Sequence, residues 1–437
     1  MATEDARYRQ TSQFRLWSFS PSQLADLRTK TNTLAKASIS ERLSSSSSSS
    51  SSAGASGANT PIPPSMAPSD QNTTTSERSQ PSPLPEFLTP AEETQLLAFY
   101  TVELLRAAAF IQLPTDIRAT AAAFLRRFYV TNSIMTYPPT ELLKTCLFFG
   151  SKAEGVYKSL KKWVDFVLSL LLAEQTIAGA LLAESFPNTT GEEILAAEFL
   201  LCQGIRFAFD VRHPYRALEG AVMELKQLED VEEKRVNAAH VRAREILKFS
   251  PLVTDAYFHY TPSQIMLAAL SLADRGLVER LLQETFHHPP PPTTDSGAST
   301  PAQTGSTRGS SVVDRENQLR GADMRNKVMG IVESCREMLA TEPPERMTEF
   351  WGTVSHSPFP ESNNIIKPLL RKLKKCRDPD RWDLVALQKA RRETAATKEN
   401  GAKKTSKEED GVVFDSSDGR DAKRRKVSAE DPFGGPL

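Results

Sequence analysis

The stretch FLRRFYVTNSIMTYPPTELLKTCLFFGSKAEG, residues 124–155, contains two apolar segments separated by a Tyr-Pro-Pro turn. In both segments large apolar residues recur three and four positions apart, which is the spacing of an α-helix with a buried face. The stretch therefore predicts one helix over residues 115–130 and another over residues 139–153, and apolar spacing further along the chain predicts a broken helix over residues 157–183 and a helix over residues 191–204. Lys152 stands at the end of the second helix, where its helical neighbours are apolar or glycine and offer no partner for its charge.

Three further helices are predicted by a shared start signal of the form Ser/Thr-Pro-x-Glu/Gln. The signal occurs at residues 20–23, 89–92 and 261–264. It combines an N-cap hydroxyl, a proline at the first helical position and a Glu or Gln at the third. Residues 190–193 form a fourth capping box without the proline. No segment alternates between apolar and polar residues in the way of a strand, so the predicted fold class is all-α.

Three regions are poor in large apolar residues. Residues 38–85 contain an unbroken serine run, residues 289–311 open with consecutive prolines, and residues 386–437 form a charged tail with few aromatic residues. Such compositions cannot bury enough apolar surface to offset the conformational entropy of the chain. We therefore expect these three regions to be disordered.

The remaining sequence predicts two helical modules with helical segments on either side. A Tyr-Thr-Pro turn later in the chain echoes the Tyr-Pro-Pro turn of the opening stretch, and similar apolar residues follow each. This echo suggests two similar modules, residues 86–212 and residues 213–345, the second of which carries the proline-rich insertion. A short helical segment, residues 1–37, precedes them, and another, residues 346–385, follows.

Composition and motifs exclude several classes of function. The formal net charge is zero, so the protein as a whole does not attract nucleic acid or anionic membranes. Its four cysteines stand singly within helical patterns, which is typical of a reduced protein without a disulfide framework or a Cys-x-x-Cys zinc site. The chain shows no secretory signal, phosphate loop, nucleophile elbow or kinase signature. The sequence therefore predicts no catalytic residue, cofactor, metal site, membrane span or direct contact with nucleic acid.

Glu198 repeats the pattern of Lys152 with the opposite charge. Its helical neighbours, Ile194, Leu195, Leu201 and Cys202, are all apolar. An unpaired buried charge is unfavourable, so the two charges need partners. Two interpretations remain open from the residues alone. Either the two charges pair with each other within the chain, or both lie on a surface that a partner covers.

Four stretches resemble the cyclin family. Residues 124–155 resemble the second and third helices of a cyclin box, and residues 192–220, EEILAAEFLLCQGIRFAFDVRHPYRALEG, resemble its fifth helix and the linker to a second box. Residues 12–28, SQFRLWSFSPSQLADLR, and residues 252–270, LVTDAYFHYTPSQIMLAAL, are similar to the N-terminal helix and second box of the cyclin H group. The resemblance implies two consecutive five-helix cyclin boxes.

The resemblance also implies a function and a set of partners. A cyclin is a non-catalytic subunit that binds and activates a cyclin-dependent kinase. The cyclin H group implies the CDK-activating kinase with its kinase catalytic subunit and assembly subunit, which is part of TFIIH and phosphorylates CDK activation loops and the RNA polymerase II C-terminal domain. Two alternatives are a transcriptional cyclin of the C, K or T type, and a TFIIB-like factor that grips DNA. The second alternative lacks support, because the N-terminus has no cysteine for a zinc ribbon and the net charge is zero.

In cyclins the lysine that closes helix three and the glutamate of helix five face the kinase. The resemblance therefore places Lys152 and Glu198 on a kinase-binding surface and favours that interpretation over an internal pair. The neighbouring residues expected to contribute to this surface are Phe148, Glu154, Leu195 and Leu201. The family usually carries an acidic pair soon after the lysine, whereas here Glu154 is followed by Gly155. The first box helix also lacks the Met-Arg-Ala-Ile-Leu motif with which some cyclins dock substrates.

Two terminal features complete the predictions. Apolar residues crowd the polar N-terminus, and we expect them to dock on the boxes of the same chain, while the resemblance to cyclins also implies a contact with the kinase; they include Trp17, Phe19, Leu24 and Leu27. A basic cluster in the charged tail has the composition of a nuclear localisation signal and predicts that the protein is nuclear; it consists of Lys423, Arg424, Arg425 and Lys426.

Overall fold

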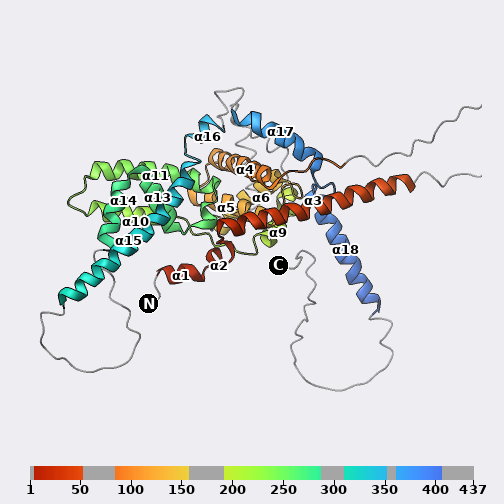
Figure 1. Cartoon of the computed structure of the whole chain (residues 1–437). Helices are drawn as coiled ribbons and strands as arrows, with labels where there is room; N and C mark the ends of the chain where they lie inside the picture. Colours follow the sequence, from red (N-terminus) through yellow and green to blue (C-terminus); the bar gives the residue numbers. More distant parts are fainter. Residues whose placement is uncertain (1–3, 53–83, 157–190, 287–309, 352–360, 406–437) are drawn as a thin grey trace, which may run out of the picture. The chain divides into compact units, whose positions relative to one another are not determined.

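The structure, a computed structural model, describes residues 4–52, 84–156, 191–286, 310–351 and 361–405. Every regular element in these ranges is a helix (Figure 1), which confirms the predicted all-α class. By their contacts the residues up to Leu387 form one compact unit and those from Gln388 a second. No helix in the described ranges combines the length and hydropathy needed to span a bilayer.

The first hydrophobic core is built around α5 (Thr115–Thr131), which packs against α4 (Pro90–Phe110), α6 (Pro139–Ala153) and α9 (Gly191–Gly204). Side chains on all sides of α5 are buried, as expected for a helix that its neighbours surround. The predicted bounds of α6 and α9 agree with the structure, and those of α5 differ by one residue. The predicted helix over residues 157–183 lies outside the described residues.

The second core is built around α13 (Pro262–Ala273). It packs against α10 (Tyr215–Lys226), α11 (Glu233–Val253), α14 (Arg275–Thr285) and α15 (Ser310–Ala340). The end of α11 and the short helix α12 (Ala256–His259) do not follow this division, because Phe249, Leu252 and Phe258 are buried in the first core. The two cores therefore interlock through the segment from Phe249 to Phe258.

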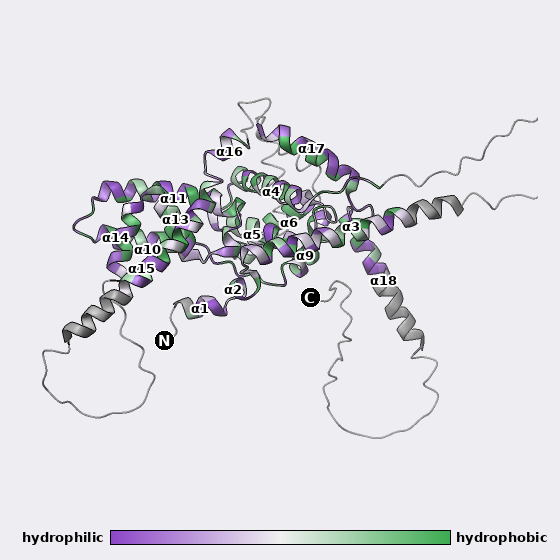
Figure 2. Ribbon diagram, in the orientation of Figure 1, coloured by the Kyte–Doolittle hydropathy of each residue, from purple (hydrophilic) through white to green (hydrophobic). Residues whose placement is uncertain are grey.

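The C-terminal part of the compact unit contains α16 (Arg346–Glu349), α17 (Glu361–Cys376) and the start of α18 (Leu384–Thr405). After α16, α17 presents apolar residues to the first core and hydrophilic ones outward (Figure 2). The last helix, α18, begins within the unit. It includes residues 386–405, so the prediction that the disordered tail begins at residue 386 is wrong over that part.

The three proline-containing start signals form the predicted capping boxes. Thr89 Oγ1 accepts a hydrogen bond from Glu92 N at 3.2 Å, and Glu92 Oε2 accepts one from Thr89 N at 2.7 Å. The same reciprocal pair of bonds occurs at residues 20–23 and 261–264. Each box satisfies two backbone donors that the helix itself cannot satisfy. The fourth signal, at residues 190–193, begins outside the described residues.

The N-terminal segment forms three helices, α1 (Glu4–Gln10), α2 (Ser12–Trp17) and α3 (Pro21–Ser52). Of these, α3 is longer than predicted. The prediction that a disordered linker begins at residue 38 is wrong as far as Ser52. Ile39 is buried and Arg42 forms an ion pair with Asp378, so tertiary contacts hold the helix beyond the predicted boundary. The average composition of the serine-rich region did not reveal the burial of Ile39 or the ion pair of Arg42. Residues 53–83 of the linker lie outside the described residues.

Candidate partner-binding surface

Lys152 and Glu198 meet where the end of α6 lies beside α9. The Lys152 ammonium forms an ion pair with Glu198 Oε1, and it also lies 5.4 Å and 5.6 Å from the ring centroids of Phe148 and Phe149. The Lys152 side chain is 35% exposed and that of Glu198 is 19% exposed. The structure thus brings both predicted charges to one place at the surface. In the free chain they pair with each other, and solvent still reaches both.

The other predicted contact residues divide between surface and core. Leu195 is exposed on α9, one turn before Glu198, and Glu154 is exposed just after Lys152. Phe148 and Leu201, by contrast, are buried in the first core. In the free chain their side chains lie beneath the exposed residues of α6 and α9, and their assignment as contact residues stays a prediction.

Three exposed aromatic residues beside the ion pair were missed by the sequence analysis. Phe199, Phe207 and Phe209, here called the aromatic ridge, are all exposed. The ring centroids of Phe207 and Phe209 are 6.2 Å apart, and those of Phe199 and Phe207 are 6.5 Å apart. Phe149 lies 5.2 Å from Phe209 and also carries the Lys152 ammonium on its ring, so the ridge and the ion pair form one continuous surface. An exposed apolar patch of this kind is typical of a protein–protein interface.

A left-handed turn presents the ridge. After α9, Arg206 and Phe207 have φ angles of 56° and 55°, a conformation that non-glycine residues seldom adopt. Each such residue costs roughly 1–2 kcal/mol. Phe207 N donates to Cys202 O at 2.8 Å, while the Arg206 guanidinium lies 5.7 Å from the ring of Trp17. The turn therefore sends one side chain onto the N-terminal segment and the next one out to solvent. The Phe-Ala-Phe sequence at residues 207–209, shortly after the predicted end of a helix, was the sequence signal that could have indicated the ridge.

The structure places the four predicted docking residues of the N-terminus against the first core of the same chain. Trp17 is buried, with the guanidinium groups of Arg127 and Arg206 lying 5.5 Å and 5.7 Å from its ring. Leu24 is also buried, and Leu27 is partly buried against the same core. The ring of Phe19 packs 6.1 Å from that of Phe258, and Phe19 N donates to Phe258 O.

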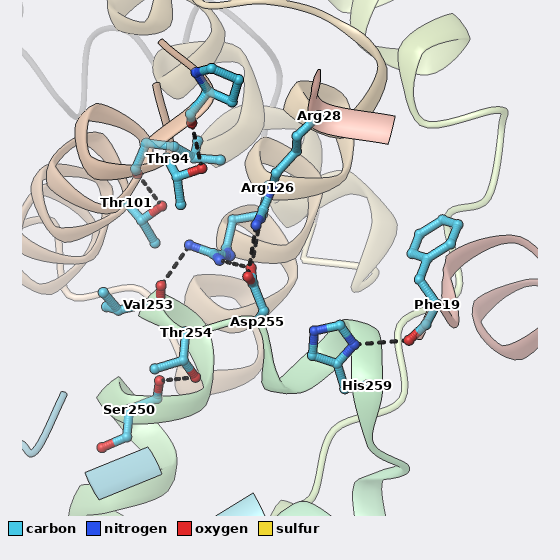
Figure 3. Close-up of polar contacts among 12 residues, drawn as sticks. Phe19, Arg28, Thr94, Thr101, Arg126, Ser250, Val253, Thr254, Asp255 and His259 are labelled. Carbon is cyan, nitrogen blue, oxygen red and sulfur yellow. Dashed lines mark hydrogen bonds and ion pairs between the residues drawn. The ribbon is translucent and has the colours of Figure 1, made fainter. Parts of the chain in front are cut away.

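Asp255 joins the N-terminal helix α3 to both cores (Figure 3). Its carboxylate accepts two hydrogen bonds from Arg28 of α3, at 2.7 Å and 2.8 Å, and one from Arg126 of α5 at 2.6 Å. Arg126 also donates to Val253 O. Burial alone would raise the pKa of the Asp255 carboxyl, but the hydrogen bonds and charges of the two arginines hold it well below its usual range.

A directed chain of hydrogen bonds ties the turn after Lys152 to the second core. Glu154 accepts from the Thr120 hydroxyl at 2.5 Å, so the Thr120 oxygen is free to accept from His213 Nε2 at 2.8 Å. His213 Nδ1 then accepts from the Tyr257 hydroxyl at 2.9 Å. Burial, helped by the charge of Arg127, lowers the pKa of His213 to about 3, which keeps the imidazole neutral. Glu154 is thus held in place although Gly155 follows it.

No group of His, Cys, Asp and Glu side chains within the described ranges is arranged to hold a metal ion. All four cysteines are free and buried. The basic cluster at residues 423–426 lies outside the described residues.

This chain is similar to known proteins both in sequence and in its two-core helical fold. The cyclin C-terminal domain family matches residues 213–340. A chain in the solved structure of the CAK complex from Chaetomium thermophilum bound to ATP-gamma-S is 46% identical. The match covers 96% of the present chain and 100% of that one, with a TM-score of 0.66. The chain belongs to the cyclin family.

Curated relatives of this cyclin place it near the cyclin H group, as predicted. It is 28% identical to Cyclin CCL1 of Saccharomyces cerevisiae over 297 residues, which cover 65% of this cyclin and 62% of the yeast protein. It is 30% identical to Cyclin-H of Xenopus laevis over 195 residues, which cover 43% of this cyclin and 54% of the frog protein. The matches therefore span about half to two thirds of the length of these relatives.

Proposed function

We propose that this cyclin binds and activates a cyclin-dependent kinase, as the non-catalytic regulatory subunit of a CDK-activating kinase within TFIIH. The observation that carries the proposal is the exposed aromatic ridge beside the Lys152–Glu198 pair. Such a surface is suited to an apolar helix with free backbone groups at one end. The 46% identity to a chain of the CAK complex supports the assignment to this kinase.

The geometry suggests how the surface acts. The aromatic ridge covers the apolar side of the kinase's mobile regulatory helix. Lys152 then donates to a carbonyl of the kinase, and Glu198 accepts from its N–H groups. These contacts replace the ion pair that the two side chains form in the free cyclin. The contacts favour the kinase conformation in which this helix is docked and the catalytic groups are aligned. Activation is therefore a shift between conformations of the kinase, and the cyclin contributes no reacting group.

The substrates and remaining partners follow from the same assignment. The activated kinase phosphorylates the activation loops of other cyclin-dependent kinases and the C-terminal domain of RNA polymerase II. The complex also contains an assembly subunit, and it acts in the nucleus. No specific feature of the described surface favours a TFIIB-like factor. A cyclin of the C, K or T type would use the same surface with another kinase.

The direct test is copurification from cells followed by identification of the bound kinase. We expect a kinase of the CDK-activating type, and we expect purified cyclin to raise its activity toward a CDK activation-loop peptide. Recovery of only another kinase would contradict the CDK-activating kinase assignment and favour the alternative cyclin types. Failure to bind any kinase would contradict the cyclin function as a whole.

Replacing Phe207 with serine is expected to weaken kinase binding by about 1.5–3 kcal/mol, which is the value of burying one large apolar side chain. The melting temperature of the free cyclin should not fall, since Phe207 is 57% exposed before binding. Titration of the purified kinase with each variant measures the effect. Met223→Ser is the matched control, because Met223 is exposed on α10, away from the ridge. Equal losses for both variants would show that the ridge has no specific role.

Replacing Lys423, Arg424, Arg425 and Lys426 with alanine is expected to move the protein from nucleus to cytoplasm without changing kinase binding in vitro. The cluster consists of four successive basic residues in a charged region with little to pack against a core. Fluorescence imaging in cells that lack the untagged cyclin measures the change, in a background where the kinase is also depleted. Undiminished nuclear signal there would contradict the assignment of the cluster.

A further inference from the structure

A cavity of about 430 Å³ lies at the edge of the first core, and no residue of the aromatic ridge lines it. Three separate segments line it: the ends of α4 and α5 that face each other, the second half of α11, and residues 344–347. Its apolar wall includes Leu105, Phe249 and Leu252. The volume falls within the roughly 300–1,000 Å³ of pockets that bind ligands.

The charges around the cavity do not balance. Arg242 forms an ion pair with Glu345 and lies 3.7 Å from Glu245, so it engages both carboxylates that line the cavity. Arg118 and Lys248 also line it, and no carboxylate of the described residues lies within ion-pair distance of either. Two of its three cations therefore lack a counter-charge from the part of the chain that the structure describes.

Arg118 is the more informative of these two cations. Its Nε donates to Leu113 O at 2.6 Å, which fixes the guanidinium at the start of α5. Burial lowers the pKa of Arg118, which shows that the charged group is partly withdrawn from water. A partly buried cation without a counter-charge is unfavourable, and a carboxylate from outside would relieve it.

We propose that this cavity binds a segment of a partner protein in which an acidic residue stands beside large apolar side chains. The carboxylate pairs with Arg118 and Lys248, and the apolar side chains cover Leu105, Phe249 and Leu252. A polyanion such as nucleic acid fits less well, because it would meet the apolar wall and the carboxylates of Glu245 and Glu345. The neighbouring stretch of this chain, residues 352–360, has the sequence GTVSHSPFP and contains no acidic residue, so it cannot supply the carboxylate.

Selection of a phage-displayed library of short random peptides on the purified full-length cyclin tests the proposal. Counter-selection uses Ala109→Trp, because Ala109 is exposed on α4 at the cavity and an indole there fills it. We expect enriched peptides to combine Asp or Glu with Leu, Ile, Phe or Trp, and to bind wild type but not Ala109→Trp. Far-ultraviolet circular dichroism verifies that each variant is folded.

Synthetic copies of the enriched peptides then identify the charges involved. Fluorescence anisotropy should show affinity reduced at least about ten-fold by Arg118→Met, and also by Lys248→Met, which changes an exposed side chain and keeps the test valid if the first variant is unstable. Arg244→Met is the matched control, since Arg244 lies on the same helix outside the cavity. Lys152→Ala should leave peptide binding unchanged, which separates this site from the kinase surface.

Three results would overturn the proposal. One is the absence of any peptide that distinguishes wild type from Ala109→Trp. Another is enrichment of peptides without acidic residues. The third is competition by duplex DNA that abolishes peptide binding and weakens steeply with salt, which would identify the occupant as nucleic acid.

Discussion

Lys152→Ala and Glu198→Ala are each expected to reduce kinase binding by about 2–5 kcal/mol, which is the effect of removing one partner of a buried, hydrogen-bonded charge contact. The melting temperature of the free cyclin should stay nearly constant in both variants. In the free chain the two side chains form a partly exposed ion pair, and such a pair contributes at most about 1 kcal/mol to folding. In the proposed complex the kinase covers both groups, so we expect the same substitutions to have a much larger effect on binding than on folding.

Isothermal titration with the purified kinase measures the loss of binding, and thermal melts of the free cyclin measure the change in melting temperature. Lys226→Ala is a matched control, because Lys226 also pairs with a glutamate across 3.4 Å and is 36% exposed, but it lies on α10, one of the helices around the second core. The opposite result would be single variants that are unstable, a double variant that recovers part of the loss, and near-normal activation once folded. That pattern would show that Lys152 and Glu198 serve only each other.

Asp255→Ala is expected to lower the free energy of unfolding by about 3–5 kcal/mol, because it leaves two arginines without their shared counter-charge. The larger part of this loss comes from Arg126, because its side chain is only 6% exposed and its charge is then left buried without a counter-charge. The N-terminal helix should also detach more readily, because Arg28 of α3 loses both hydrogen bonds to the carboxylate. We therefore expect faster proteolysis within α3 as well as lower stability.

The Asp255 carboxylate also makes the stability of the folded cyclin depend on pH. Its pKa in the folded protein lies below the unfolded value of about 3.9, so its contribution is fully present above that value. The contribution is lost as the pH falls below about 4, where the unfolded chain takes up the proton first. Asp255→Ala should therefore show a weaker loss of stability than wild type over that range.

Urea denaturation of the free cyclin at several pH values measures both effects. Asp230→Ala is the matched control, because Asp230 also accepts two hydrogen bonds from an arginine, Arg280, but at the exposed surface. We expect its denaturation midpoint to match that of wild type. If Asp255→Ala were no less stable than the control, the contact between α3 and the two cores would not depend on this cluster.

The sequence by itself determined the helices and where many of them begin. Capping boxes such as residues 89–92 and the apolar spacing of residues 139–153 depend on groups within four positions of one another. Interactions of that range depend only on residues close together in the sequence, and so the all-α class could be predicted. The charges of Lys152 and Glu198 could be found in the same way, because neither has a polar neighbour on its own helix. Resemblance to the cyclins then supplied the expectation of a kinase.

Only the tertiary structure decided which side chains meet from distant parts of the chain. Arg28 and Asp255 are 227 positions apart, and no local pattern connects them. The same holds for Arg42 and Asp378, which keep α3 helical beyond the point where composition predicted disorder. The exposure of Phe207 depends on a left-handed turn, and the burial of Phe148 and Leu201 depends on which helices pack against them. Local sequence limits the conformation of each segment, but burial and long-range pairing are properties of the packed whole.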